Sequence, residues 1–337
     1  MSVGRRHIRT LRYAVQTFFL LLSISIGYQF YNFVAQLQAG GSALVQRPPS
    51  VDAFLPIAGL MSFKYFLLPG NIEPFHPAAL VMFIAIVGVS LVMKKGFCGW
   101  ICPVGTVPQV FWMAGEKVFG RNFKIKEYAD IALRSVKYIV MALFLVLIGI
   151  ALRPEMMVLF FVSDYYRIVD VKTMEFFTMM SATVFWVLVG TGVLSLLYKN
   201  FWCRYLCPYG ALLGLLSRVS PVKICRNSEA CSHCGECSAN CPSLIDVEEG
   251  EVVDSAECFA CLTCVSRCPS KGALEVTLKK GKERMAFRPF LYPLILVLLF
   301  YLVIGAGMVT GNWRSHMPAS EYSKIMSDRS LSDSHSP

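Results

Sequence analysis

Charged residues are scarce in this chain of 337 residues: Asp, Glu, Lys and Arg together make up 16%, whereas soluble globular proteins average about 25%. Hydrophobic residues make up 55% of the chain. The shortage of charge argues against a purely soluble protein, and the excess of apolar residues excludes disorder for most of the chain. The length allows about two structural units.

Histidine and several functional motifs are also rare or missing. The chain has five histidines, and none falls in the middle of a long apolar run, where the axial ligands of a membrane haem b would lie. We therefore expect no haem. The chain contains no Walker loop, no dinucleotide fingerprint and no Gly-x-Ser-x-Gly elbow, so we expect no bound nucleotide and assign no catalytic residue.

Five stretches without a charged residue are long enough, or nearly so, to cross the roughly 30 Å hydrocarbon core of a membrane. They are Tyr13–Gln46, Pro74–Met93, Tyr138–Leu152, Phe176–Tyr198 and Pro289–Trp313. The predicted transmembrane helices cover about residues 13–37, 76–93, 136–152, 178–198 and 288–310. The third is short, and we expect it to reach spanning length if Arg134 and Lys137 snorkel at one end and Arg153 at the other.

The first run is expected to be a retained anchor, because it is longer than the apolar part of a signal peptide. It breaks at Gly40-Gly41, so its helix is predicted to end near Leu37. A further apolar segment, Ala53–Ile72, contains two prolines, two glycines and a lysine. These residues favour a broken interfacial or re-entrant segment over a sixth span.

The basic residues are unevenly distributed between the loops. With the N-terminus inside, 24 of the 32 Lys and Arg residues fall in inner segments and 8 in outer ones. The net charge of +10 is therefore explained by the basic residues of the inner loops, which indicate membrane topology. We expect no nucleic-acid partner. The predicted location is the bacterial cytoplasmic membrane, with the N-terminus and all 13 cysteines on the cytoplasmic side and the C-terminal tail outside. In that reducing compartment metal binding is a better expectation than disulfides.

Eight of the 13 cysteines form two copies of one spacing, Cys-x2-Cys-x2-Cys-x3-Cys-Pro. In bacterial two-cluster ferredoxins the first three thiolates of such a run bind one [4Fe–4S] cluster and the fourth reaches the other. Zinc also uses paired cysteines, but two complete runs that both end in Cys-Pro are far more specific for iron–sulfur clusters. We therefore predict two [4Fe–4S] clusters. The expected ligands are Cys231, Cys234, Cys237 and Cys268 for cluster 1, and Cys258, Cys261, Cys264 and Cys241 for cluster 2.

Both runs lie in a segment, residues 221–284, that resembles the two-cluster ferredoxin domain. The resemblance implies an α+β fold with two short hairpins and two short helices around the clusters. His233 lies inside the first run and is expected to be a donor near the cluster sulfurs or simply exposed. Cys225 belongs to neither run and is expected to be a buried or unligated thiol.

Four more cysteines form a second repeat at an offset of 105 residues. Residues 97–105 and 202–210 both read aromatic-Cys-x-aromatic-aliphatic-Cys-Pro-x-Gly, and each copy follows an expected span at its inner end. The repeat indicates an internal duplication that could bring four thiols together at the inner membrane face. A further metal or iron–sulfur centre, redox-active dithiol pairs and a structural role all remain open for Cys98, Cys102, Cys203 and Cys207.

With these motifs the chain resembles the membrane polyferredoxin family, which includes NapH, CcoG and the membrane core of NosR. The resemblance covers about residues 50–315 and is closest to the NosR-type core. It implies a mainly α-helical integral membrane protein with an inserted ferredoxin-like domain. The chain departs from the family in lacking room for the outer flavin domain of NosR or the outer domain of CcoG, and in adding a fifth span to the four of NapH.

The expected organisation combines these patterns. A membrane core, residues 1–220, carries four spans and both Cys-x3-Cys-Pro turns, and the ferredoxin domain follows at residues 221–284. The fifth span covers residues 288–310, and residues 311–337 are predicted to be a disordered outer tail rich in Ser, Asp and His.

Two functions fit this organisation. The first is a membrane-bound electron-transfer protein that relays electrons between the quinone pool or a cytoplasmic donor and a respiratory or redox partner protein. It would be a subunit or oxidoreductase component rather than a stand-alone enzyme. The alternative is an accessory factor for the maturation or metal loading of a respiratory metalloenzyme, for example by copper reduction. A redox sensor ranks below both, since no output domain is visible.

Few other residues suggest chemistry. His76, in Glu73-Pro74-Phe75-His76-Pro77, is a candidate to take a proton from a quinol, although an interfacial turn fixed by its prolines is the preferred interpretation. Glu155, Asp164 and Asp170 are expected in a solvated outer loop rather than in a partner site.

Overall fold

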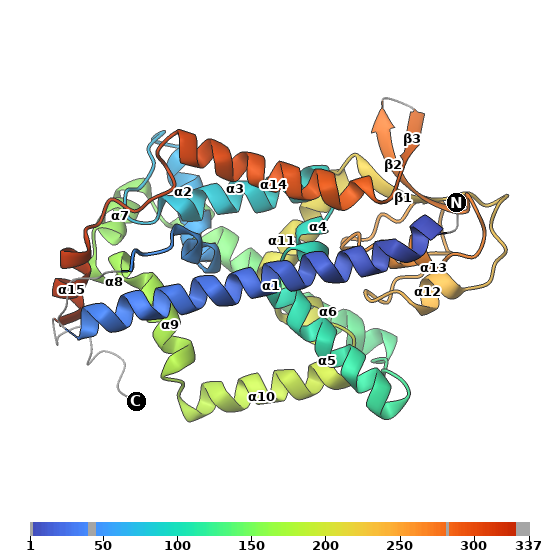
Figure 1. Ribbon diagram of the computed structural model, residues 1–337, viewed down its shortest axis with the longest axis horizontal. Helices are drawn as coiled ribbons and strands as arrows, with labels where there is room; N and C mark the ends of the chain where they lie inside the picture. The colour runs from blue at the N-terminus through green and yellow to red at the C-terminus, as the bar shows by residue number, and fades with distance from the viewer. Residues whose placement is uncertain (1–2, 40–44, 281–282, 328–337) are drawn as a thin grey trace. The chain divides into compact units, whose positions relative to one another are not determined.

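The computed structural model describes residues 3–39, 45–280 and 283–327. In these ranges the chain is mainly helical and has one small antiparallel sheet (Figure 1). The chain divides into two compact units. The first, which we call the cysteine unit, consists of Met1–Leu21, Ile86–Ala142 and Trp186–Phe300. The second, which we call the His76 unit, consists of Leu22–Ala85, Leu143–Phe185 and Tyr301–Pro337.

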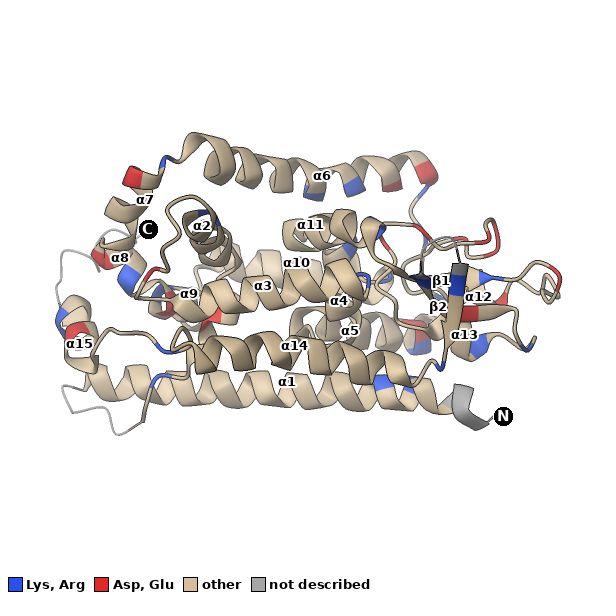
Figure 2. Cartoon of the chain, turned by 90° about the horizontal axis from the view of Figure 1, so that it is seen from above, with Lys and Arg blue, Asp and Glu red and all other residues tan. Residues whose placement is uncertain are grey.

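Each of the five apolar runs contains all or part of a helix of at least 16 residues. These helices are α1 Val3–Gln38, α3 Pro77–Val92, α6 Glu127–Val146, α10 Ala182–Leu197 and α14 Leu291–Val309. Figure 2 shows that α3 and α14 carry no charged residue along their lengths. The first helix ends one residue beyond the predicted Leu37, while the break predicted at Gly40-Gly41 lies outside the described residues.

Within the part of the chain that the structure describes, three helical segments are long and apolar enough to cross a membrane: His7–Gln38, Glu127–Ala151 and Leu291–Val309. The middle one is α6 continued by a π-helical turn, η2 Leu147–Ala151. A fourth span results only if α9 Val169–Thr178 and α10 form one span across their 74° bend. Helix α3 has 16 residues, fewer than the roughly 20 that a span needs. These helices indicate an integral membrane protein, and the number of five spans stays a prediction.

Two details of the predicted spans are wrong. The fourth run was expected to be one helix from about residue 178, but α10 begins at Ala182 after the bend. Lys137 does not snorkel: its side chain is fully buried, and its Nζ lies 2.7 Å from both carboxylate oxygens of Glu257. The ammonium is more stable in this ion pair because an unpaired charge in an apolar environment is costly.

The His76 unit is built from short helices packed around aromatic side chains. Its short helices are η1 Pro49–Phe54, α2 Pro56–Leu67, α7 Pro154–Phe161, α8 Asp164–Arg167, α9 and α15 Ala319–Ser327. The segment predicted to be broken at Ala53–Ile72 is interrupted at Leu55, between the end of η1 and the start of α2. Helix α2 has 12 residues, too few to span a membrane, and begins at a proline. Its Gly59 packs closely on α3, where a Cβ would lie 2.9 Å from Ala79 O.

The predicted disorder of residues 311–337 is wrong for the part of the tail that the structure describes, which ends at residue 327. Helix α15 places Tyr322 and Ile325 about one turn apart, and both are buried in a cluster with residues of α1. The Tyr322 ring meets the Phe33 ring edge-on at 5.6 Å. The burial of these apolar side chains outweighs the polar composition of the segment.

The cysteine unit combines short helices with the three-stranded sheet. The strands are β1 Val222–Arg226, β2 Leu274–Lys280 and β3 Glu283–Phe287, paired antiparallel in the order β1-β2-β3. Ile224 opposes Val276 in the first pair, and Leu278 opposes Met285 in the second. The two short helices implied for the ferredoxin segment are present as α12 Glu236–Ala239 and α13 Thr263–Arg267. The strands form one sheet rather than the two hairpins expected, because β2 pairs with both of its neighbours.

Candidate metal centres

The four cysteines predicted for cluster 1 lie around one small cavity. Cys231, Cys234, Cys237 and Cys268 all line it, together with residues of β2 and the loop before α12. Cys268 comes from the second run, 31 residues after Cys237 in sequence. Cys268 of the second run therefore lies beside the first three cysteines of the first run, as a crossed ligand set would require.

The four cysteines predicted for cluster 2 are also neighbours. Cys264 is buried, and its pKa is raised by burial first and then by the nearby Cys261, Cys258 and Cys241. Burial and the same neighbours raise the pKa of Cys241 to about 12. Thiols that are this hard to ionise become thiolates when a metal displaces the proton.

The two ferredoxin runs share an unusual backbone. His233 and Gly235 flank the second cysteine of the first run, Ala260 and Leu262 occupy the same places in the second, and all four have positive φ between 46° and 68°. Alternation of left- and right-handed residues turns successive N–H groups towards one point, a geometry that suits anionic iron–sulfur centres. His233 itself is exposed and pairs with Glu248, at 2.9 Å from Nδ1 to Oε1.

The two Cys-x3-Cys-Pro turns fold alike. The first cysteine of each turn lies in a short helical turn, α4 Gly96–Trp100 or η3 Trp202–Leu206. The second cysteine is the N-cap of a helix with proline at its first position, α5 Pro103–Phe119 or α11 Pro208–Leu216, which a 3-10 turn η4 Ser217–Val219 follows. Proline suits this position because it needs no N–H partner there. Cys207 Sγ accepts a hydrogen bond from Gly210 N at 3.2 Å.

The four cysteines of the turns line a single cavity of about 70 Å³. The structure therefore brings together Cys98, Cys102, Cys203 and Cys207, which the repeat suggested. All 13 cysteines are free thiols. We call this space the turn cavity. Its other polar lining residues are Arg12, Lys95, Gln109, Asn200, Arg204, Tyr209, Ser243 and Glu257.

Both turns are attached to the loops that carry the cluster 2 cysteines. Trp100 Nε1 donates to Ala260 O at 3.0 Å, between Cys258 and Cys261. Asn200 Nδ2 donates to Pro242 O at 3.1 Å, directly after Cys241. Gly99 lies so close to the same loops that a Cβ would be 2.4 Å from Phe259 O. The turn cavity is therefore next to the cluster 2 site.

Cys225 lies apart from every cysteine group. Its Sγ lies 3.0 Å from Thr277 Oγ1 and accepts a hydrogen bond from Arg284 Nη1 at 2.8 Å. It belongs to strand β1, opposite Glu275 of β2, and lines none of the cysteine-lined cavities.

Replacing Cys225 with serine should therefore leave the iron content unchanged. The hydroxyl can keep the contacts to Thr277 and Arg284, so the free energy of unfolding should change by less than about 1 kcal/mol. Iron and sulfide analysis of the purified Cys225→Ser protein checks this. A loss of iron would show that Cys225 is a ligand.

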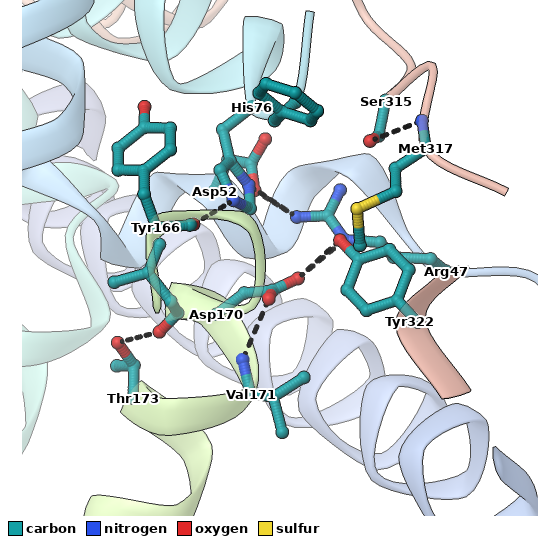
Figure 3. A network of polar contacts seen from close by, with 12 residues as sticks. Arg47, Asp52, His76, Tyr166, Asp170, Val171, Thr173, Ser315, Met317 and Tyr322 are labelled. Carbon is teal, nitrogen blue, oxygen red and sulfur yellow. Dashed lines mark hydrogen bonds and ion pairs between the residues drawn. The ribbon is translucent and has the colours of Figure 1, made fainter. Parts of the chain in front are cut away.

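His76 and Asp170 belong to a buried ionic network in the His76 unit (Figure 3). Arg47 Nε donates to Asp170 Oδ2 at 2.6 Å, and its Nη2 pairs with Asp52. His76 Nδ1 lies 3.1 Å from Asp52 Oδ1, and Nε2 donates to Tyr166 O at 3.0 Å. With both ring nitrogens engaged and the side chain fully buried, His76 has no nitrogen left for a quinol.

One expectation about this network is therefore wrong. Asp170 is not in a solvated loop, because only 2% of it is exposed. The interfacial turn expected around His76 stays a prediction. The pKa of Asp52 is lowered: burial acts to raise it, but the charges of Arg47 and His76 outweigh burial. Arg47 could not be recognised as the partner of Asp170 from sequence, since it precedes Asp170 by more than a hundred residues.

Comparisons with known proteins show to which family the chain belongs. The model of a 4Fe-4S dicluster domain matches residues 223–284, and that of a 4Fe-4S binding domain matches residues 75–126 and 178–226. The chain is 37% identical over 325 residues to YccM of Escherichia coli (strain K12), named as a candidate electron transport protein; the match covers 95% of this chain and 91% of YccM. The chain belongs to the membrane polyferredoxin family.

More distant members extend the comparison. The ferredoxin-type protein NapH of Haemophilus influenzae is 27% identical over 256 residues, which are 73% of this chain and 81% of NapH. The regulatory protein NosR of Stutzerimonas stutzeri is 25% identical over 231 residues, 66% of this chain but 30% of NosR. No solved structure matches the chain.

The family assignment fits the site geometry. Both segments matched by the 4Fe-4S binding domain contain one Cys-x3-Cys-Pro turn, and the dicluster domain contains both ferredoxin runs. Members of this polyferredoxin family carry iron–sulfur clusters, and the cavities lined by four cysteines suit such clusters. The chain is therefore an iron–sulfur protein.

Proposed function

We propose that this polyferredoxin relays electrons between the quinone pool or a cytoplasmic donor and a respiratory or redox partner protein. The main observation in support is that both Cys-x3-Cys-Pro turns are hydrogen-bonded to the loops that hold the cluster 2 cysteines. This arrangement provides a continuous route from the cluster 1 cysteines, through the cluster 2 cysteines, to the turn cavity. The names of YccM and NapH support an electron-transport role.

We further propose three iron–sulfur centres, on the cytoplasmic side of the bacterial inner membrane. Clusters 1 and 2 have the crossed ligand sets given above, and the third is held by Cys98, Cys102, Cys203 and Cys207. Iron–sulfur clusters supply one-electron transfer without bond chemistry. The basic inner loops support the sidedness.

The thiols of the turn cavity favour a metal centre over redox dithiols. Burial raises the pKa of the Cys98 thiol to about 11, although the nearby Lys95 opposes the shift. Reactive dithiols need the opposite, a lowered pKa. A purely structural role would not require four free thiols around a cavity that also holds charged side chains.

The protein around the turn cavity holds these thiols in place. Cys102 and Cys207 are N-caps, so the amide groups that begin α5 and α11 lie beside the cavity. Gly105 has to be small, because a Cβ there would lie 2.6 Å from Cys98 O. Helix N-termini and N–H groups near sulfur stabilise negative charge.

The crossed ligand sets give a direct prediction. Cys268→Ser should remove the iron of cluster 1 and leave cluster 2, whereas Cys241→Ser should remove cluster 2 and leave cluster 1, each with a loss of about four iron atoms per chain. Iron analysis with EPR of the reduced proteins measures both. Loss of the cluster to which each cysteine is adjacent in sequence would contradict the crossing.

The function itself is tested with the purified protein in proteoliposomes. A quinol, or a reduced cytoplasmic donor such as a soluble ferredoxin, is added and the EPR signals of the reduced centres are followed. Reduction by one of these donors is expected. Centres that respond to dithionite but to no quinol or protein donor would reject the relay.

A further inference from the structure

Two buried positive charges at the turn cavity make no ion pair with a carboxylate among the described residues. Arg12 and Lys95 are each only 4% exposed. Arg12 donates to Gly99 O at 3.0 Å and to Gln109 Oε1, which are both uncharged acceptors. Lys95 lines the cavity and makes no hydrogen bond or ion pair among the residues that the structure describes. Its charge acts on Glu257: burial raises the pKa of that carboxyl, but Lys95 and Lys137 together outweigh burial and lower it.

The carboxylates at this place are each shared by two cations. Asp130 Oδ2 pairs with Arg204 Nη2 at 2.8 Å and with Arg134 Nε at 2.9 Å. Glu257 pairs with Lys137 at 2.7 Å and also lies near Lys95. Burying an ammonium or a guanidinium without a counter-charge is costly. The buried cations therefore outnumber the carboxylates near them, and this excess indicates that the cavity contains negative charge. Neutral thiols or disulfides supply none, whereas four thiolates around a [4Fe–4S] core have a formal charge of about −2.

Lys95 reaches from the first turn towards the second. A Cβ built on Gly210 would lie 3.6 Å from Lys95 Nζ and 3.4 Å from Cys207 Sγ, so the ammonium approaches the cysteine of the other turn. The equivalent residue of the second turn is Asn200, which is neutral and donates to Pro242 O. At this position the two copies of the repeat therefore differ by one positive charge, which only the first copy has, and this charge lies beside the cysteine-lined cavity.

We infer that Lys95 is a positioning residue that balances the charge of an iron–sulfur centre held by the two turns and raises its reduction potential. This inference rests on the third centre of the proposed function. Reduction adds one negative charge to the cavity, and a buried ammonium nearby favours the reduced state by Coulomb attraction, which water screens little. Arg12 contributes the second positive charge but is also bonded to the turn backbone, so Lys95 is the cleaner test.

The test is a potentiometric titration of Lys95→Met, followed by EPR on the full chain in detergent. At the wild-type midpoint of the turn centre, the ratio of reduced to oxidised centre should fall about tenfold, which is about 59 mV for a one-electron couple. Clusters 1 and 2 should titrate as in the wild type. Lys95→Arg keeps the charge and should restore the wild-type midpoint.

Lys199 offers a matched control. It precedes the second turn, and its ammonium lies 5.2 Å from the centre of the Trp112 ring without lining the cavity. Lys199→Met removes the same charge and should leave all three midpoints unchanged. A shift as large as that of Lys95→Met would mean that any basic residue near the turns has this effect, and would overturn the specific role of Lys95.

Iron analysis separates the inference from the proposed function. About twelve iron atoms per chain with an unshifted midpoint in Lys95→Met would overturn the inference and leave the third centre standing. About eight iron atoms in the wild type would remove the third centre and the inference together. If Lys95→Met loses the iron of the turns, the polar Lys95→Gln is titrated instead; loss of this iron in both variants would show a role in assembly and overturn the role in potential.

Discussion

Replacing both Cys98 and Cys203 with serine is expected to remove about four of about twelve iron atoms per chain and to leave the two ferredoxin clusters in place. Both thiols line the turn cavity, and neither is a helix N-cap, so the helices that follow the turns keep their first hydrogen bonds. The ferredoxin cysteines lie in other loops and keep their partners. Iron and sulfide content and the EPR spectrum of the reduced protein measure the result.

The same variant tests the direction of the relay. If the turn centre lies between the membrane and the ferredoxin clusters, a quinol should no longer reduce clusters 1 and 2, while dithionite still reduces them. The single variant Cys225→Ser is the control for loss of a thiol outside these sites. Unchanged iron content would exclude a centre at the turns, and unchanged reduction by a quinol after loss of this iron would place the centre off the route.

The candidate ligands could be predicted from sequence because each ferredoxin run is local. Three of four thiols lie within seven residues, so spacing alone restricts the geometry, and the repeat at Cys98 and Cys203 is likewise visible in the sequence. The surroundings could not be predicted. Lys95 and Glu257 reach the turn cavity from segments far apart in sequence, and only the folded chain shows which charges find partners.

For the membrane helices, the pattern of apolar residues is not sufficient to predict where a helix bends. A run without charge predicts an apolar segment, but it does not show the bend between Thr178 and Ala182, where the sequence has neither proline nor glycine. In the C-terminal tail the sequence predicted too little structure rather than too regular a helix. Its polar composition predicted disorder, yet Tyr322 and Ile325 find a buried surface that composition cannot reveal.

The buried network of the His76 unit should contribute strongly to stability. Arg47→Met leaves the carboxylates of Asp52 and Asp170, both at most 2% exposed, without their shared positive partner. Breaking a buried ion pair on one side typically costs about 3–5 kcal/mol. We expect this loss in the free energy of unfolding, measured by reversible denaturant titration in detergent micelles.

A second arginine of the same unit serves as the control. Arg167 pairs with Glu321, but the two side chains are 21% and 32% exposed. Arg167→Met should therefore cost about 1 kcal/mol or less, since solvent screens the pair. A loss for Arg47→Met no larger than for Arg167→Met would contradict the importance of the buried network.

A triple variant identifies the cause of the loss. If the cost of Arg47→Met comes from two stranded carboxylates, then adding Asp52→Asn and Asp170→Asn should restore part of the stability, because the amides carry no charge to bury. If the cost comes from lost packing of the arginine, the two further changes should add to the loss instead. The iron content should stay unchanged throughout, because all 13 cysteines belong to the other unit. Stability that falls with iron still bound would assign the network to folding rather than to electron transfer.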